Sequence, residues 1–216
     1  SLGARCERSG DSLLINTERL IFRRPDDSLV SQIRASTYLL GASLARFGRA
    51  YIQSFGGCDF CKRPIDLHLL ACRTFGADVR GDSIFSHGLR GASIRFSKVS
   101  VGATVNAILL AATASGESRI ENFAREPHIF NLIDYLRSAG ADITIEENAM
   151  IIHGRELYGG EVTVEGDPIE AGTYIALSAI TGGKGGGRPD SAMGGGRDID
   201  KIPEALAKAE EILSNI

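Results

Sequence analysis

The chain has 216 residues, which is enough for one large domain or two small ones. Its apolar fraction of 43% and charged fraction of 24% are ordinary for a soluble globular protein, and a net charge of −3 gives no overall attraction to nucleic acid. The longest apolar stretches are too short to span a membrane, and the first residues lack the apolar run of a signal peptide. Four cysteines are too few for a disulfide scaffold of this size, so we expect a cytoplasmic protein with reduced thiols.

A Gly-Ala pair followed by a charged residue occurs three times, within the segments 1–20, 74–91 and 138–159. Glycine at the end of a helix supplies a left-handed cap, and the residues that follow alternate between apolar and polar. Each of the three segments is therefore predicted to contain a strand, a turn and a second strand.

The stretches between these hairpins each predict a long apolar helix, a short strand and an amphipathic helix. In chain order the predicted elements are 26–48, 49–55 and 63–76, and then 100–116, 118–123 and 126–140.

The elements together indicate a domain-sized repeat of βαβαββ units, at about 1–91, 92–158 and 159–183. No single unit can bury an apolar face alone, so the units are expected to share one core. The long apolar helices should lie innermost and the sheets outside. The fold class is therefore predicted to be α/β (α+β), with residues 1–183 forming the domain.

The third unit stops at a glycine-rich stretch, 184–197, whose composition is typical of a flexible linker. Residues 198–216 then predict a helix rich in Ala, Glu and Lys. The first unit lacks the helix that should precede it, so we expect this last helix to supply the missing element, as in a circular permutation.

The loop sequence "FGGCDFCKRPIDLHL" at 55–69 carries the clearest chemical signal. Its paired glycines permit positive φ and a close approach of a ligand. Arg63 and Pro64 are predicted to open a helix, and an arginine at a helix N-terminus forms an anion site. Cys58 in these surroundings is predicted to have a lowered pKa, as a proton donor or nucleophile requires.

Several readings of these residues remain open. Cys58 and Cys61 have the C-x-x-C spacing of zinc ligands, but the sequence has no second ligand pair to accompany them. The alternatives are a redox-active cysteine pair and a plain loop cysteine. Cys6 and Cys72 are expected to be core thiols, and His68 a structural histidine.

A second anion site is predicted in "FSKVSVGAT" at 96–104, where Lys98, the Ser100 hydroxyl and the backbone around Gly102 could bind a diphosphate. The alternative is an N-capped helix with a solvated lysine. Arg34 lies inside the apolar helix predicted at 26–48, and it either extends its charge to solvent or faces a cleft.

Four stretches resemble the UDP-N-acetylglucosamine enolpyruvyl transferases (MurA) of the enolpyruvyl transferase family. They are "IRASTYLLGASLARFG", "GGCDFCKRPIDLHL", "SVGATVNAILLAATASGESRIENFAREPHIFNLIDYLRSAGADI" and "DPIEAGTYIALSAITGG", and the resemblance covers about 1–183. It implies an inside-out α/β barrel built from βαβαββ units, three in each of two domains.

The resemblance also implies an activity, the transfer of enolpyruvyl from phosphoenolpyruvate to the 3′-hydroxyl of UDP-N-acetylglucosamine in peptidoglycan synthesis. No metal or cofactor is implied. Cys58 matches the cysteine that donates a proton and is the target of fosfomycin, and Arg63 and Arg34 match arginines that hold phosphoenolpyruvate. The implied sugar-nucleotide contacts are Pro64, Ile65, Asp66, Leu67, Lys98, Ser100, Val101 and Gly102.

Two departures from the family pattern affect these expectations. Asp59, Phe60 and Cys61 replace the small apolar residues that usually follow the loop cysteine, so loop closure and the response to fosfomycin are expected to differ. The family's second domain, with its aspartate base, has no counterpart in the matching segments. The isolated chain is therefore expected to be inactive, and an inactive binding or folding domain is the alternative reading; a CxxC redox protein is a further one.

Overall fold

A computed structural model describes residues 2–10, 12–57, 63–167, 169–170, 172–173, 184–188, 191–195, 200 and 203. The chain divides into two compact units, Ser1–Val162 and Thr163–Ile216.

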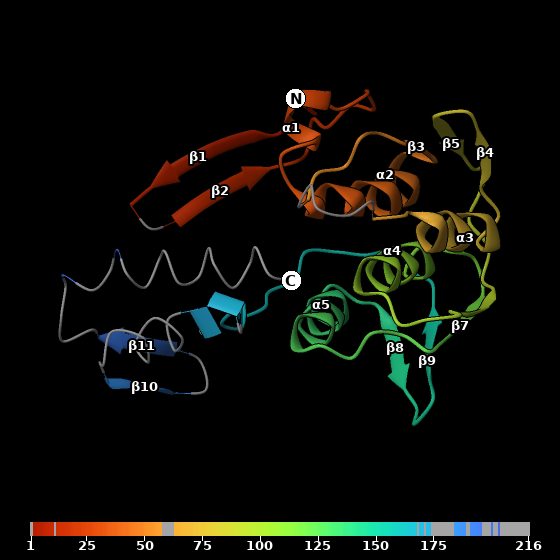
Figure 1. Ribbon diagram of the computed structural model, residues 1–216. Helices are drawn as coiled ribbons and strands as arrows, with labels where there is room; N and C mark the ends of the chain where they lie inside the picture. The colour runs from red at the N-terminus through yellow and green to blue at the C-terminus, as the bar shows by residue number, and fades with distance from the viewer. Residues whose placement is uncertain are drawn as a thin grey trace. The chain divides into compact units, whose positions relative to one another are not determined.

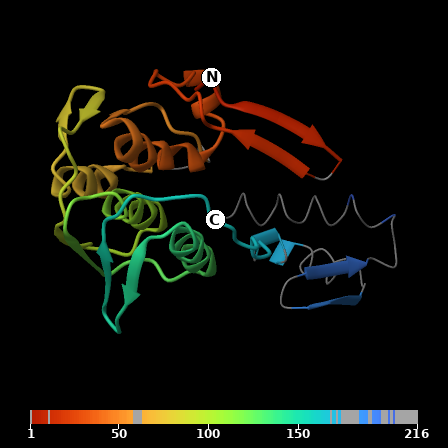
Figure 2. The ribbon, with the colours of Figure 1, turned by 180° about the vertical axis from the view of Figure 1, so that it is seen from behind.

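Fifteen helices and strands are described within the first unit, and Figures 1 and 2 show them from opposite sides. In chain order they are β1 (Arg5–Ser9), β2 (Ser12–Asn16), α1 (Asp27–Val30), the 3₁₀ helix η1 (Arg34–Tyr38), α2 (Leu39–Phe47), β3 (Arg49–Tyr51), α3 (Asp66–Thr74), β4 (Asp78–Arg80), β5 (Ser83–Phe85), β6 (Ser93–Arg95), α4 (Val101–Ala111), β7 (Glu117–Glu121), α5 (Pro127–Ser138), β8 (Asp142–Ile145) and β9 (Ala149–His153).

The second repeat forms a complete β6-α4-β7-α5-β8-β9 unit, as the sequence predicts. Its four-stranded sheet has the order β6-β7-β9-β8, in which β6 and β7 are parallel and the other neighbours antiparallel. The first repeat has the corresponding order β3-β5-β4 in a three-stranded antiparallel sheet. The predicted glycine caps are confirmed at Gly76 and Gly140, which follow α3 and α5 with φ of 88° and 99°. Gly3 also has a positive φ, of 92°, but it follows no described helix.

The core centres on α4, which is buried on nearly every side. It packs against α2, α3, α5 and strands of the four-stranded sheet. The innermost position predicted for this helix is confirmed, and so is the buried face of α5, formed by Ile129, Ile133 and Leu136. At roughly 25 cal/mol per Å² of apolar area, these side chains supply much of the stabilisation of the unit.

The prediction of one helix over 26–48 is wrong. The segment divides into α1, η1 and α2, because Ile33 is extended (φ −133°, ψ 141°) and interrupts the helical hydrogen bonds. The Ser36 hydroxyl lies 2.7 Å from the carbonyl oxygen of Val30, where it competes with the backbone for that acceptor. Arg34 is therefore the first residue of a 3₁₀ helix and not part of a continuous helix.

The β1–β2 hairpin pairs Arg5 with Asn16 and Ser9 with Ser12, and all of its described residues are exposed. The expectation that Cys6 is a core thiol is therefore wrong, because both faces of this ribbon are open. Cys72 is fully buried on α3, as predicted.

In the second unit, the glycine-rich segment predicted as a linker contains a two-stranded antiparallel hairpin, β10 (Lys184–Arg188) and β11 (Ser191–Gly195). The helix predicted at 198–216 lies outside the described residues except for positions 200 and 203. Its proposed role in completing the domain therefore stays a prediction, as do the domain limits.

Candidate functional site

Two arginines from distant parts of the sequence lie together at the start of η1 and just before α3. Nη2 of Arg34 donates a hydrogen bond to the backbone oxygen of Arg63 at 3.3 Å. Burial and the neighbouring Arg63 charge lower the pKa of Arg34. Among the residues that the structure describes, neither guanidinium has a carboxylate within ion-pair distance. Two adjacent cations without a counterion provide a binding site for an anion.

The glycine pair Gly56 and Gly57 lies against the segment that leads to Arg34. The backbone N–H of Gly56 donates to the Val30 oxygen at 3.2 Å, and a Cβ at Gly56 would come within 2.3 Å of the Ser31 oxygen. Gly57 has φ +141°, and a Cβ there would lie 3.6 Å from Cδ of Arg34. The predicted positive φ is confirmed at Gly57, while the close approach at Gly56 is to the chain's own backbone.

Helix α3 begins later than predicted. Its N-cap is Ile65 and Asp66 is its first residue, so Pro64 precedes the cap instead of opening the helix. Pro64 disfavours helical conformation in the residue before it, Arg63. Asp66 places a negative charge in the first turn of α3, where it interacts favourably with the helix dipole. Arg63, Pro64 and Asp66 are exposed, Ile65 is half-buried and Leu67 is buried.

The N-terminus of α4 is the second predicted anion site. Ser100 is its N-cap, and the Ser100 Oγ accepts a hydrogen bond from the Ala103 N–H at 3.4 Å. The first N–H groups of a helix have no partner within it, so those of Val101 and Gly102 remain available to a ligand. Lys98 is exposed two residues before the cap.

His68 connects these two groups of residues. It is 4% exposed on α3, and its ring lies against Gly102, where a Cβ would be 2.7 Å from Cε1. Its Nδ1 lies 2.7 Å from Nδ2 of Asn106, which confirms the prediction of a structural histidine. Asn106 itself was missed in the sequence, although a single amide inside an otherwise apolar helix is a signal that could have identified it.

Cys58 and Cys61, together with Lys62, lie outside the described residues. Cys72 is not a candidate nucleophile, because burial raises its pKa to about 12. Within the described ranges no group of three or more His, Cys, Asp or Glu side chains could hold a metal ion. None of the described helices is long and apolar enough to cross a membrane.

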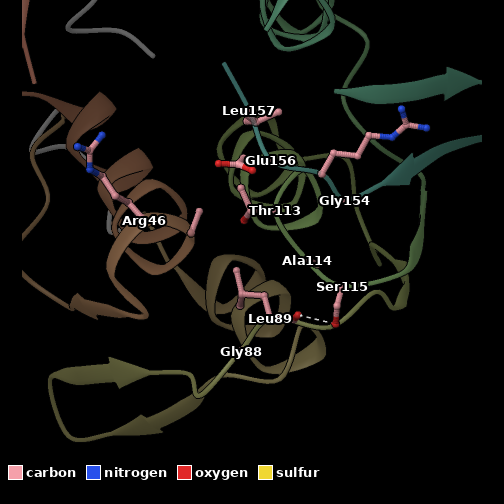
Figure 3. A pocket seen from close by; sticks show the side chains of 11 residues that line it. Arg46, Gly88, Leu89, Thr113, Ala114, Ser115, Gly154, Glu156 and Leu157 are labelled. Atoms are coloured by element: carbon pink, nitrogen blue, oxygen red, sulfur yellow. Dashed lines mark hydrogen bonds between the residues drawn. The ribbon is translucent and has the colours of Figure 1, made fainter. Parts of the chain in front are cut away.

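A hollow of the first unit lies at the opposite end of the same helices (Figure 3). Its volume is about 730 Å³, and Arg46, Thr113, Ser115 and Leu157 are among the residues that line it. Helix C-termini end there, and their free carbonyl groups disfavour anions. Arg46 already donates to the backbone oxygen of Thr17 at 2.9 Å. These features make the arginine end a better candidate for an anion site than this hollow.

Comparison with known proteins agrees with the repeat and the motifs. The family model for EPSP synthase (3-phosphoshikimate 1-carboxyvinyltransferase) matches residues 1–184. The chain belongs to this family of enolpyruvyl transferases.

Its curated relatives include proteins named UDP-N-acetylglucosamine 1-carboxyvinyltransferase that are between 38% and 43% identical to it. The match to the protein of Wolbachia pipientis wMel is 43% identical and covers 71% of this chain and 38% of that protein. The match to the protein of Azorhizobium caulinodans is 41% identical and covers 92% of this chain and 46% of that protein. This enolpyruvyl transferase chain thus spans less than half the length of these relatives.

Two solved structures share the fold. The enolpyruvyl transferase NikO from Streptomyces tendae has a TM-score of 0.72 at 21% identity, and the match covers 88% of this chain and 54% of that chain. EPSP synthase from Acinetobacter baumannii has a TM-score of 0.59 at 19% identity, covering 83% of this chain and 42% of that chain. At these identities the likeness establishes an α/β fold of the enolpyruvyl transferase type.

Proposed function

We propose that this chain forms the cysteine-loop half of a UDP-N-acetylglucosamine 1-carboxyvinyltransferase. That enzyme transfers enolpyruvyl from phosphoenolpyruvate to the 3′-hydroxyl of UDP-N-acetylglucosamine and releases phosphate, in the cytoplasm, as a step of peptidoglycan synthesis. The observation that carries the proposal is the pair of neighbouring cations Arg34 and Arg63, which have no described carboxylate partner. The names and identities of the curated relatives support the choice of substrates.

In this proposal the two arginines hold the phosphate and carboxylate of phosphoenolpyruvate and stabilise the charge that develops as the enol ether is polarised. The diphosphate of the sugar nucleotide is placed at the N-terminus of α4, against Val101 and Gly102, with Ser100 and Lys98 beside it. Pro64, Ile65, Asp66 and Leu67 at the start of α3 are placed on the uridine side.

Cys58 is proposed as the proton donor. Lys62 and Arg63 follow it in the sequence, and neighbouring positive charge makes a thiol a stronger acid, which gives up its proton more readily and yields a reactive thiolate. Brief iodoacetamide treatment and peptide mapping should label Cys58 faster than the exposed Cys6, and should leave the buried Cys72 unlabelled. Labelling of Cys6 before Cys58 would contradict this role.

The finer architecture is also a proposal. The complete βαβαββ repeat from β6 to β9, the shorter first repeat and the central position of α4 support an inside-out barrel in which a third unit from residues 159 onward completes the domain. The catalytic base and further arginines are assigned to the half of the relatives that this chain does not match, so activity requires that second domain. This 216-residue chain alone is therefore expected to release no phosphate.

Two measurements on the purified chain test the proposal. Calorimetric titration should detect binding of each substrate, and Arg63→Ala should weaken the binding of phosphoenolpyruvate by about 10-fold to 100-fold, the usual effect of losing one charged hydrogen-bond donor. A phosphate-release assay with both substrates should give no turnover. Undetectable binding of either substrate at millimolar concentration, or phosphoenolpyruvate binding that Arg63→Ala leaves unchanged, would contradict the assigned site. Steady turnover would contradict the need for a second domain.

A further inference from the structure

The side chain of Asn106 is fully buried in the middle of α4 and joins three other segments. Its Oδ1 accepts a hydrogen bond from the Gly41 N–H of α2 at 2.7 Å. Its Nδ2 donates to the Thr37 oxygen of η1 at 3.1 Å, and lies 2.7 Å from Nδ1 of His68 on α3. One amide therefore links the segment that carries Arg34 to both helices that border the anion site.

These contacts fix the protonation of His68. A backbone N–H can only donate and a backbone oxygen can only accept, so Gly41 and Thr37 determine which end of the Asn106 amide is oxygen and which is nitrogen. The amide nitrogen then has only hydrogens to offer Nδ1 of His68, which must accept. The ring is therefore neutral and carries its proton on Nε2.

The protonated edge of the ring lies at the first turn of α4. A Cβ at Gly102 would be 3.0 Å from Nε2, so only glycine leaves room for the ring there. Within the described residues, the hydrogen bond to Asn106 is the only one that the ring makes, which leaves Nε2 without a partner. Burial and the nearby Arg34 lower the pKa of His68 to about 4, so the neutral form persists at physiological pH.

We propose that Asn106 is a positioning residue for the anion site at the N-terminus of α4: it fixes the Nε2–H tautomer of His68 and holds η1, α3 and α4 together, so that the His68 ring stays against the first turn of α4. The Nε2–H of His68 then acts as a neutral hydrogen-bond donor to a phosphoryl oxygen at Gly102. Only the identity of the ligand rests on the proposed function; the tautomer does not.

The first test needs no ligand. In a long-range ¹H–¹⁵N spectrum of the chain at pH 7, His68 should have the chemical shifts of a ring protonated on Nε2 alone. In Asn106→Asp the new carboxylate has no hydrogen to donate, so Nδ1 should become protonated. Asn148→Asp makes the same change at an exposed turn position and should leave the His68 shifts unaltered. A wild-type ring protonated on Nδ1 would overturn the inference.

The second test measures affinity for UDP-N-acetylglucosamine and for inorganic phosphate. His68→Gln keeps an N–H donor near the position of Nε2, and should retain affinity within about 3-fold, because that hydrogen bond survives. His68→Asn can still accept from Asn106 but has no group that reaches Gly102, and should bind at least about tenfold more weakly. The difference in affinity between His68→Gln and His68→Asn distinguishes a hydrogen-bond donor at Nε2 from a side chain that only fills space. It also tests the donor role if Asn106→Asp fails to fold.

Equal affinities in His68→Gln, His68→Asn and the wild type would overturn the donor role. If the wild-type chain binds phosphate but not the sugar nucleotide, the proposed substrate fails while the inference stands. If it binds neither, the proposed function fails. The positioning role of Asn106 would still be supported if the wild-type ring is protonated on Nε2 alone and Nδ1 becomes protonated in Asn106→Asp.

Discussion

Arginines lie at both ends of α4, but their charge opposes the helix dipole at one end and complements it at the other. The helix between them is only 11 residues, or roughly 16 Å, long. At the N-terminal end, Arg34 and Arg63 add positive charge where the helix dipole is already positive. At the C-terminal end, Arg46 lies in the last turn of the neighbouring α2, where the dipole is negative and a cation is favourable. The first arrangement is unfavourable until an anion binds, while the second stabilises the free protein.

Acid should destabilise the N-terminal end through His68, and this is the largest effect that we expect. Its pKa is about 4 in the folded protein and 6.5 ordinarily, so between these values the unfolded chain binds more protons. Stability should therefore fall as the pH is lowered from 6.5 to about 4, by about 3 kcal/mol in total at 1.36 kcal/mol per pKa unit.

Urea unfolding of the wild type and His68→Gln at several pH values between 5 and 7 measures this contribution. The difference between the two slopes isolates His68 from the carboxylates. Parallel curves for the two proteins would show that His68 has no depressed pKa.

Two arginine variants test the comparison directly. Arg34→Ala should weaken binding of phosphoenolpyruvate by about 10-fold to 100-fold, because it removes a charged hydrogen-bond donor from the site. It should not lower the stability of the free chain, because it also removes the repulsion from Arg63. Arg46→Ala should leave binding unchanged and cost about 0.3–1 kcal/mol of stability, the usual value of a cation at a helix C-terminus.

Calorimetry and thermal unfolding of both variants supply the two readouts. The comparison would fail if Arg46→Ala weakened binding as much as Arg34→Ala.

The smallest effect concerns the hydroxyl groups at the two ends. Ser100→Ala removes the N-cap of α4 and should cost about 1 kcal/mol of stability. Thr113→Ala removes an exposed hydroxyl that only contacts the Leu110 oxygen, at 3.4 Å, and should change stability by less than about 0.5 kcal/mol. Chemical denaturation of the two variants side by side measures the difference, and equal losses would argue against the cap.

The sequence predicted the repeating parts of this fold well, because they follow from local periodicity. The hairpins, α5 with its buried face and the central position of α4 all rest on apolar spacing and glycine caps, and they are confirmed. The break of the predicted helix at 26–48 was missed, because it depends on the extended backbone of Ile33 and on the hydroxyl of Ser36. Neither leaves a periodic signal.

The candidate site was predicted only in part for a similar reason. Motifs identified Arg34, Arg63 and the N-terminus of α4 one by one. Their proximity depends on long-range contacts, above all the contact of His68 with Gly102 and Asn106. The exposure of Cys6 was missed because a strand pattern does not reveal which faces are covered.

The most direct test of the whole account is a titration of the ¹⁵N-labelled chain with UDP-N-acetylglucosamine, followed by the backbone amide signals. The account predicts shifts at Arg63, Val101 and Gly102, and none at Ser115 or Leu157 in the hollow at the other end of α4. Shifts confined to Ser115 and Leu157, or saturation there at lower ligand concentration, would contradict it.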